Sequence, residues 1–141
     1  MKRLLLLIIL IVLVGCATTP IKSIKEASPV PSSNIFYKSE NSVNNVIFLR
    51  DSGFMLSGNP AYLFMKTEPN YEKIKLANLG PGEMVEFSLR EGEYTFHVEG
   101  NPIFVGLVEN EIFQKIESNK TYFFRIFPSQ GFQIQRTSLK N

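Results

Sequence analysis

The side chains that most often carry out catalysis are scarce in this chain of 141 residues. It contains one histidine (His97), one aspartate (Asp51), one cysteine (Cys16) and no tryptophan. A serine–histidine–aspartate triad would have to use that single pair, a zinc site needs three or four ligands, and a disulfide needs two cysteines. Calcium takes six to eight oxygen ligands, and the chain has no spaced run of aspartates to supply them. We therefore expect no metal site and no cofactor.

Glutamate is the remaining candidate for acid–base chemistry. Glu83 and Glu86 lie on one expected strand, and Glu91, Glu93 and Glu99 surround the hairpin after it. Two carboxylates about 5–9 Å apart can hydrolyse a glycosidic bond. Such a site also needs a sugar cleft, and tryptophan, the usual sugar platform, is absent. We expect these charges on turns and solvated faces and predict no catalytic residues, with a weak glutamate-dependent hydrolase as the alternative.

The segment from Arg50 to Phe54 is the one polar cluster that suggests a partner. Arg50 and Asp51 flank the end of an expected strand, and Ser52, Gly53 and Phe54 follow. An ordinary turn with a local ion pair, which contributes about 0–1 kcal/mol when exposed, explains the cluster. A loop that faces a partner protein explains it as well. Arg50, Asp51 and Phe54 are therefore the candidate partner-facing residues.

His97 alternates with apolar residues in another expected strand. Tyr94, Phe96 and Val98 share one face of that strand, and His97 points to the other. No second histidine or free cysteine is present to complete a metal site with it. We expect a histidine at the surface or rim of the domain rather than a ligand or a base.

The elements that must position these residues are short strands. From Ile35 onward, apolar runs with a period of two are repeatedly broken by Gly, Pro or Asn, which is typical of half-buried strands. The expected strands are Ile35–Lys38, Val46–Arg50, Ala61–Lys66, Lys73–Leu79, Met84–Leu89, Glu93–Val98, Ile112–Glu117, Thr121–Phe127 and Phe132–Arg136. This spacing predicts an all-β fold, an antiparallel β-sandwich of about seven to nine short strands, in one domain over residues 35–141.

The N-terminus has the pattern of an export signal. Lys2 and Arg3 precede an unbroken run of eleven Leu, Ile and Val residues from Leu4 to Val14. As a helix this run is roughly 17 Å long, too short to span a hydrocarbon core of about 30 Å, and it has the length of a secretory signal. The run ends in the residues Leu13, Val14, Gly15 and Cys16.

These four residues resemble the lipobox of bacterial lipoproteins. The resemblance implies that residues 1–15 are removed, that Cys16 becomes the lipidated N-terminus, and that two or three acyl chains anchor the protein. One chain alone gives only marginal membrane binding. In Gram-negative lipoproteins, an Asp directly after the lipidated Cys favours retention in the inner membrane. This chain has Ala17 at that position, so the resemblance implies the outer membrane, facing the periplasm.

Residues 16–34 read as a flexible linker between anchor and domain, because they are rich in Pro and Ser and poor in large apolar side chains. A flexible chain of that length spans about 25 Å; a first edge strand within Ile21–Lys25 is the alternative.

Without Lys2 and Arg3, 13 of the 15 basic residues remain against 13 acidic ones. These charges are interspersed, whereas a nucleic-acid binder normally shows a basic patch, so we expect no nucleic-acid partner.

Four stretches resemble the DUF2846 family, which comprises small bacterial lipoproteins of unknown function. Val46–Phe54 is similar to its first strand and Arg-x-x-Gly-aromatic turn, and Ala61–Lys66 to its second strand. Leu89–Phe96 and Lys120–Arg125 resemble its later strands, and the first of these is also similar to PEGA-like and transthyretin-like sandwiches. The pattern differs at Glu91, where the family usually has Pro. The resemblance implies a β-sandwich and no known activity.

The sequence therefore predicts a lipid-anchored envelope lipoprotein that is not an enzyme. The expected function is that of a binding module in the periplasm, with an envelope protein or a cell-wall component as partner. A weak carboxylate-dependent envelope hydrolase and an immunity-type protective lipoprotein are the alternatives. The ligand and the oligomeric state do not follow from the sequence.

Overall fold

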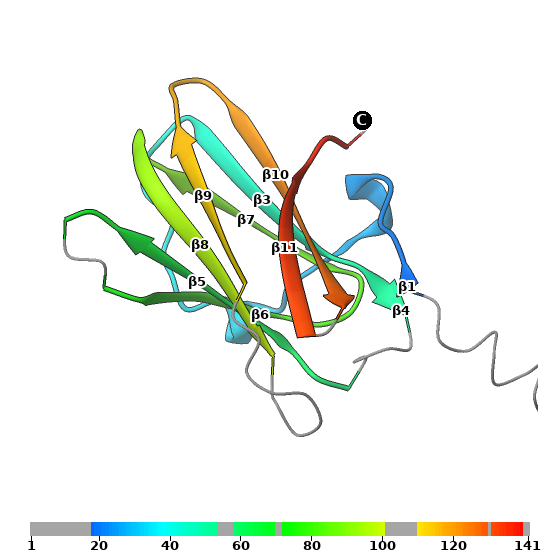
Figure 1. Cartoon of the computed structure of the whole chain (residues 1–141). Coiled ribbons are helices and arrows are strands. Elements are labelled where there is room, and N and C mark those ends of the chain that lie inside the picture. The colour runs from blue at the N-terminus through cyan, green and yellow to red at the C-terminus, as the bar shows by residue number, and fades with distance from the viewer. Residues whose placement is uncertain (1–17, 54–57, 70–71, 101–109, 130, 140–141) are drawn as a thin grey trace, which may run out of the picture.

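The computed structural model describes residues 18–53, 58–69, 72–100, 110–129 and 131–139, which form a two-layered all-β fold (Figure 1). One layer is a five-stranded sheet in the order β11-β10-β3-β7-β2, the other a four-stranded sheet in the order β6-β5-β8-β9, and β1 pairs with β4. The elements are β1 (Thr18–Thr19), η1 (Ile24–Glu26), β2 (Ser28–Pro29), η2 (Ser32–Asn34), β3 (Asn44–Arg50), β4 (Ser52–Gly53), β5 (Ala61–Thr67), β6 (Ile74–Leu79), β7 (Glu83–Leu89), β8 (Gly92–Gly100), β9 (Asn110–Ile116), β10 (Thr121–Ser129) and β11 (Gly131–Thr137).

This architecture confirms the all-β, sandwich-like fold. Eight of the nine expected strands are present with bounds within two residues of the prediction. The exception is 35–38, where Ile35 forms a single bridge to Ala77 and no strand is present. Two strand pairs also depart from an antiparallel arrangement, because β10 runs parallel to β3 and β2 runs parallel to β7.

Strand β3 is buried on both of its faces. Val46 and Phe48 point into the space between the two sheets, and Ile47 and Leu49 point to the outer side of the five-stranded sheet. A strand that lies between two partners and is covered on both faces needs a nearly continuous apolar sequence, which residues 46–49 supply. The parallel register joins Asn45 to Thr121 through Arg50 to Ile126.

Aromatic rings from both sheets fill the core. Phe48 packs edge-on against Phe96 of the opposite sheet, with ring centroids 4.9 Å apart, and stacks on Phe124 at 5.2 Å. Phe96 and Phe124 also touch, at 5.2 Å, and all three rings are fully buried. Burying one such side chain stabilises the fold by about 1.5–3 kcal/mol. These contacts hold the two sheets face to face.

The N-terminal segment packs on the outer side of the five-stranded sheet. Residues 18–30, which we call the strap, pair through β1 with β4 and through β2 with β7. Ile21 lies in a second apolar cluster with Ile47 and Leu49, and Val30 reaches the main core. The flexible linker predicted over residues 16–34 is therefore corrected from Thr18 onward. Ile21, Ile24 and Ala27, which lie among the prolines and serines, cover the outer side of β3.

The sandwich has two distinct ends. At the β1–β4 end, strands β3 and β10 finish and β7 and β11 begin. At the opposite end, which we call the hairpin end, β7 turns into β8 and β9 turns into β10. In the described part of the chain, no helix is long and apolar enough to cross a membrane.

Candidate functional site

Arg50 is buried between the two sheets, although the sequence suggested a partner-facing residue. Its Nη1 donates a hydrogen bond of 2.6 Å to the carbonyl of Leu79, the last residue of β6, and its guanidinium lies 4.5 Å from the centre of the Phe132 ring. Burial lowers the pKa of Arg50 to about 10, against the opposing charge of Glu83. Arg50 therefore connects the five-stranded sheet to the four-stranded sheet at the β1–β4 end.

Asp51 is also buried, and its carboxylate joins three segments. Arg125 Nε lies 2.8 Å from both carboxylate oxygens, and Arg125 Nη2 makes a further short contact with Oδ2. The backbone N–H of Ile21 donates to Asp51 Oδ1 at 3.2 Å. Hydrogen bonding to Asp51 raises the pKa of Arg125 against the effect of its burial. Asp51 thus fastens the strap to β10.

The expected partner-facing loop of Arg50, Asp51 and Phe54 is consequently not supported. Both charged side chains are buried because each satisfies backbone groups where the two sheets and the strap meet. Phe54 lies outside the described residues, as do Cys16 and the other lipobox residues, Leu13, Val14 and Gly15.

The structure does not bring the glutamates of the alternative hydrolase site together. Glu83 accepts a hydrogen bond of 2.6 Å from the N–H of Gly80 and so closes a turn at the β1–β4 end. Glu86 is exposed on β7, on the outer side of the five-stranded sheet. Glu91 and Glu93 are exposed at the hairpin end, where β8 of the other sheet begins. Paired carboxylates for hydrolysis are therefore not formed by this group.

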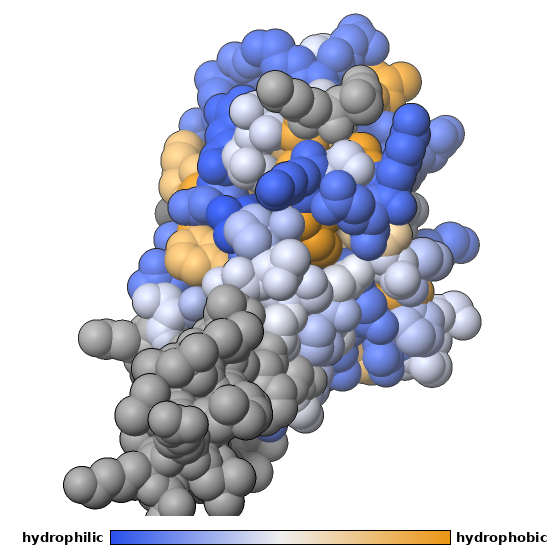
Figure 2. Space-filling model, turned by 90° about the vertical axis from the view of Figure 1, so that its right-hand side faces the viewer, coloured by the Kyte–Doolittle hydropathy of each residue, from blue (hydrophilic) through white to orange (hydrophobic). Residues whose placement is uncertain are grey.

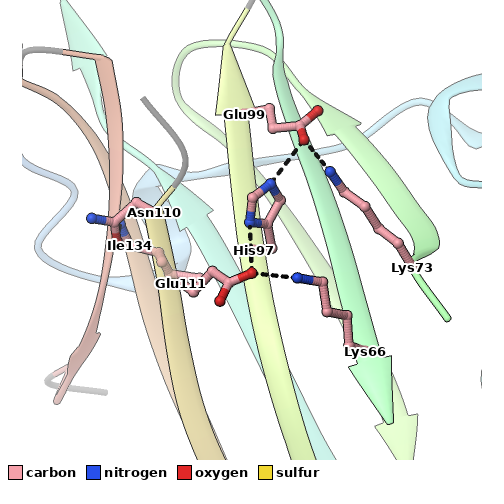
Figure 3. A network of polar contacts seen from close by, with 7 residues as sticks. All are labelled: Lys66, Lys73, His97, Glu99, Asn110, Glu111 and Ile134. Carbon is pink, nitrogen blue, oxygen red and sulfur yellow. Dashed lines mark hydrogen bonds and ion pairs between the residues drawn. The ribbon is translucent and has the colours of Figure 1, made fainter. Parts of the chain in front are cut away.

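A polar network on the outer side of the four-stranded sheet is the candidate site (Figure 3). His97 is central in it, with Nε2 2.8 Å from Glu99 Oε1 and Nδ1 3.3 Å from Glu111 Oε1. Each glutamate is also paired with a lysine, Glu99 with Lys73 and Glu111 with Lys66. The five side chains come from three neighbouring strands and the residue before β6, so sheet register alone places them side by side.

His97 is fully buried although it points away from the core. Strand pairing sets it between Phe64 on β5 and Glu111 on β9, and the rings of Phe64 and His97 lie 6.0 Å apart. The expectation of a surface or rim histidine is therefore wrong, because the side chains of neighbouring strands cover the ring. The outward direction that the alternation predicted is correct.

The electrostatics of the network favour charged carboxylates. For Glu99, burial raises the pKa, but hydrogen bonds from Lys73 and His97 outweigh it and hold the pKa below the usual value of 4.5. For Glu111, the hydrogen bond from Lys66 lowers the pKa, and partial burial opposes it.

Aromatic side chains lie on both sides of this network. Phe113 on β9 is 62% exposed, and Phe36, which lies beside β6 at the far edge of the sheet, is 51% exposed. Lys75 Nζ lies 4.2 Å from the centre of the Phe36 ring and 5.2 Å from that of Tyr62. We call the outer side of the four-stranded sheet, with these aromatics and the His97 network, the network face.

The network face presents paired charges and aromatic side chains. Among the described residues, no three His, Cys, Asp or Glu side chains form a group that could hold a metal ion. Each carboxylate of the network already accepts from a lysine and contacts His97. What the face presents outward is aromatic surface with fixed charges of both signs.

Sequence reasoning missed the network because its members are far apart in the chain. Lys66 and Glu111 are 45 residues apart, and Lys73 and Glu99 are 26 apart. Single-strand alternation shows which of them point outward, but only the register of β5, β8 and β9 shows that they meet. The pairing of Phe64 with His97 and of His97 with Glu111 is the signal that would have found it.

Comparison with protein-family models and with curated proteins finds no match to this chain. The resemblance to the DUF2846 family therefore stays a prediction.

Proposed function

We propose that this protein is a lipid-anchored envelope lipoprotein whose sandwich domain binds another envelope protein through the network face and catalyses no reaction. One observation carries the binding part of the proposal. Two large aromatic side chains, Phe36 and Phe113, are more than half exposed on the same sheet face, on either side of the ionic network around the buried His97. Interface cores are enriched in aromatic residues, and exposed ones surrounded by polar groups are typical anchors.

The contrast between the two sheets supports the choice of this face. The strap covers apolar residues on the outer side of the five-stranded sheet, where Ile47 and Leu49 are buried beneath Ile21. On the network face, Phe113 keeps most of its ring in contact with water. Its position between fixed charges of both signs suits a protein partner better than a polyanion, which would favour lysines alone.

The membrane part of the proposal depends on the sequence. Leu13, Val14, Gly15 and Cys16 resemble a lipobox, and residues 1–15 have the pattern of an export signal. Two or three acyl chains on Cys16 would make attachment stable. We propose the inner leaflet of the outer membrane, facing the periplasm, from the Ala that follows the cysteine. Palmitate labelling of the cells, lost in Cys16→Ser, is the expected result, and labelling that persists in Cys16→Ser contradicts it.

Site-specific crosslinking in the native cells tests the binding function. A photoreactive amino acid replaces Phe113 in the full chain, and a matched variant carries it at Gln135, which is exposed on β11 of the other sheet. We expect one envelope protein to be captured from position 113, not from position 135, and only when Cys16 is intact. The same protein should be captured from position 36.

Equal capture from positions 113 and 135 would refute the network face as the binding surface. Capture of peptidoglycan fragments instead of a protein would assign the face to the cell wall and contradict the proposed protein partner. A turnover that depends on Glu99 or Glu111 would contradict the non-catalytic role.

A further inference from the structure

The fold leaves almost no free chain between the proposed lipid anchor and the domain. Thr18 pairs with Gly53 and Thr19 with Ser52, and Ser52 Oγ donates to the carbonyl of Thr19 at 3.3 Å. Ile21 follows, 7% exposed, with its N–H bound to the buried carboxylate of Asp51. The strap is therefore folded onto the sandwich from its first described residue.

The distance from the anchor to the domain is consequently short. Only Ala17 stands between Cys16 and Thr18. Two residues of fully extended chain cover at most about 7 Å, whereas a flexible linker over residues 16–34 would span about 25 Å. The acyl chains of Cys16 would thus begin within about 7 Å of the β1–β4 pair.

The described surface at the β1–β4 end suits contact with lipid headgroups. No charged residue lies within its turns, which consist of Thr18–Pro20, Ser52–Gly53, Gly58–Pro60, Gly80–Gly82 and Ser129 with Gly131. Glu83, which follows the Gly80–Gly82 turn, is half-buried, and its carboxylate accepts a hydrogen bond from the N–H of Gly80. Asp51 is buried in its ion pair, and the first charge along the strap is the cation Lys22, which anionic headgroups attract. Figure 2 faces the side on which β1 and β4 lie in Figure 1; the described surface in the middle of this view is mostly pale, and deep blue residues gather toward its top.

The hairpin end has the opposite character. Arg90, Glu91 and Glu93 lie at the β7–β8 turn, and Glu117 and Lys120 at the β9–β10 turn, all exposed. These three carboxylates outnumber the two cations, so the negative potential of anionic lipids repels this surface on balance. The two ends of one sandwich therefore differ in the way that a fixed orientation on a membrane requires.

We infer that the strap holds the β1–β4 end directly against the lipid headgroups. The hairpin end then points away from the membrane, and the network face lies perpendicular to the membrane plane. This inference rests on the proposed lipidation of Cys16. Its partner is the bilayer surface itself. It replaces a tethered, freely rotating domain with one whose orientation is set by the pairing of Thr18 with Gly53.

Depth measurement on the full lipidated protein in liposomes tests the orientation. A fluorophore is attached to Ser129→Cys at the β1–β4 end or to Ser118→Cys at the hairpin end. Both serines are exposed; Ser129 is the last residue of β10 and Ser118 lies in the turn before this strand. A strand of nine residues separates the sites by about 26 Å. With a quencher on the lipid headgroups, we expect the label at residue 129 to lose most of its fluorescence and the label at residue 118 to lose little.

A spacer variant shows whether the strap causes this. Ten Gly and Ser residues inserted between Ala17 and Thr18 add about 18 Å of flexible chain and should make quenching at the two sites similar. Equal quenching at both sites in the protein without the spacer overturns the inference, and so does unchanged quenching at residue 129 with the spacer. Mass spectrometry of the N-terminal peptide separates the two proposals. A missing acyl mass on Cys16 overturns the proposed function, whereas an acylated protein with equal quenching overturns only the orientation.

Discussion

Removing Arg125 and removing Asp51 should lower the free energy of unfolding by different amounts. The side chain of Asp51 is 0% exposed and that of Arg125 is 26% exposed. Arg125→Ala leaves a buried carboxylate whose remaining hydrogen-bond donor, among the described residues, is the N–H of Ile21, and removing one partner of a buried pair costs about 3–5 kcal/mol. Asp51→Ala leaves a guanidinium that already reaches water, so we expect a smaller cost of about 2–3 kcal/mol.

Urea unfolding followed by tyrosine fluorescence measures both costs, since the chain has no tryptophan. The protein would carry Cys16→Ser and begin at residue 16, so that lipid does not interfere. Ser52→Ala is the matched control: it removes an exposed hydrogen bond to the strap, which we expect to cost at most about 0.5 kcal/mol. Amide exchange at Ile21 should accelerate in Asp51→Ala. A costlier Asp51→Ala than Arg125→Ala, or a coupling below about 0.5 kcal/mol in the double mutant, would refute the reasoning.

Three further perturbations test the buried polar groups. His97→Ala should lower the free energy of unfolding by about 2–4 kcal/mol, because it opens a cavity and removes a donor from Glu99; His97→Gln should cost less, and equal urea midpoints would contradict this. Because the folded pKa values of Glu99 and Glu111 are lowered, their stabilisation is complete above the usual carboxyl pKa and is lost as pH falls through the folded values. When unfolding is measured from pH 6 to pH 3, the urea concentration at the midpoint should therefore decrease once the pH is below about 4.5. The decrease should be less steep in the double variant Glu99→Gln with Glu111→Gln. Arg50→Met should cost about 1–2 kcal/mol and Arg50→Ala about 3 kcal/mol or more, because Met keeps packing against Phe132. Both variants lose the hydrogen bond to Leu79, so equal costs in thermal unfolding would show that packing against Phe132 contributes little and would contradict the prediction.

Local patterns in the sequence were sufficient for most of the strands. In β7, Val85, Phe87 and Leu89 alternate with Glu86 and Ser88, and the structure buries the first set as expected. Alternation is a property of one strand and its burial, so it can be read without knowing the partner strands. The direction in which His97 points was predicted correctly for the same reason.

Features that depend on distant residues could not be predicted. The burial of Asp51 requires Arg125, which lies 74 residues away, and the burial of His97 requires the register of three strands. The strap was taken for a linker because its composition resembles one. Its packing depends on Ile21 meeting Ile47 and Leu49, and composition cannot show that contact.

The parallel pairing of β3 with β10 also affects when the chain can fold. Asn45 finds its partner in Thr121, 76 residues later in the sequence, and every contact of this strand pair has a similar separation. Folding dominated by such non-local contacts is slow, because a large loop must close before the contacts form. During synthesis, β3 therefore lacks one neighbour until β10 has been made. If the chain crosses a membrane before it matures, as we propose, late closure would favour an unfolded chain during export, and β10 and β11 would complete the five-stranded sheet afterwards.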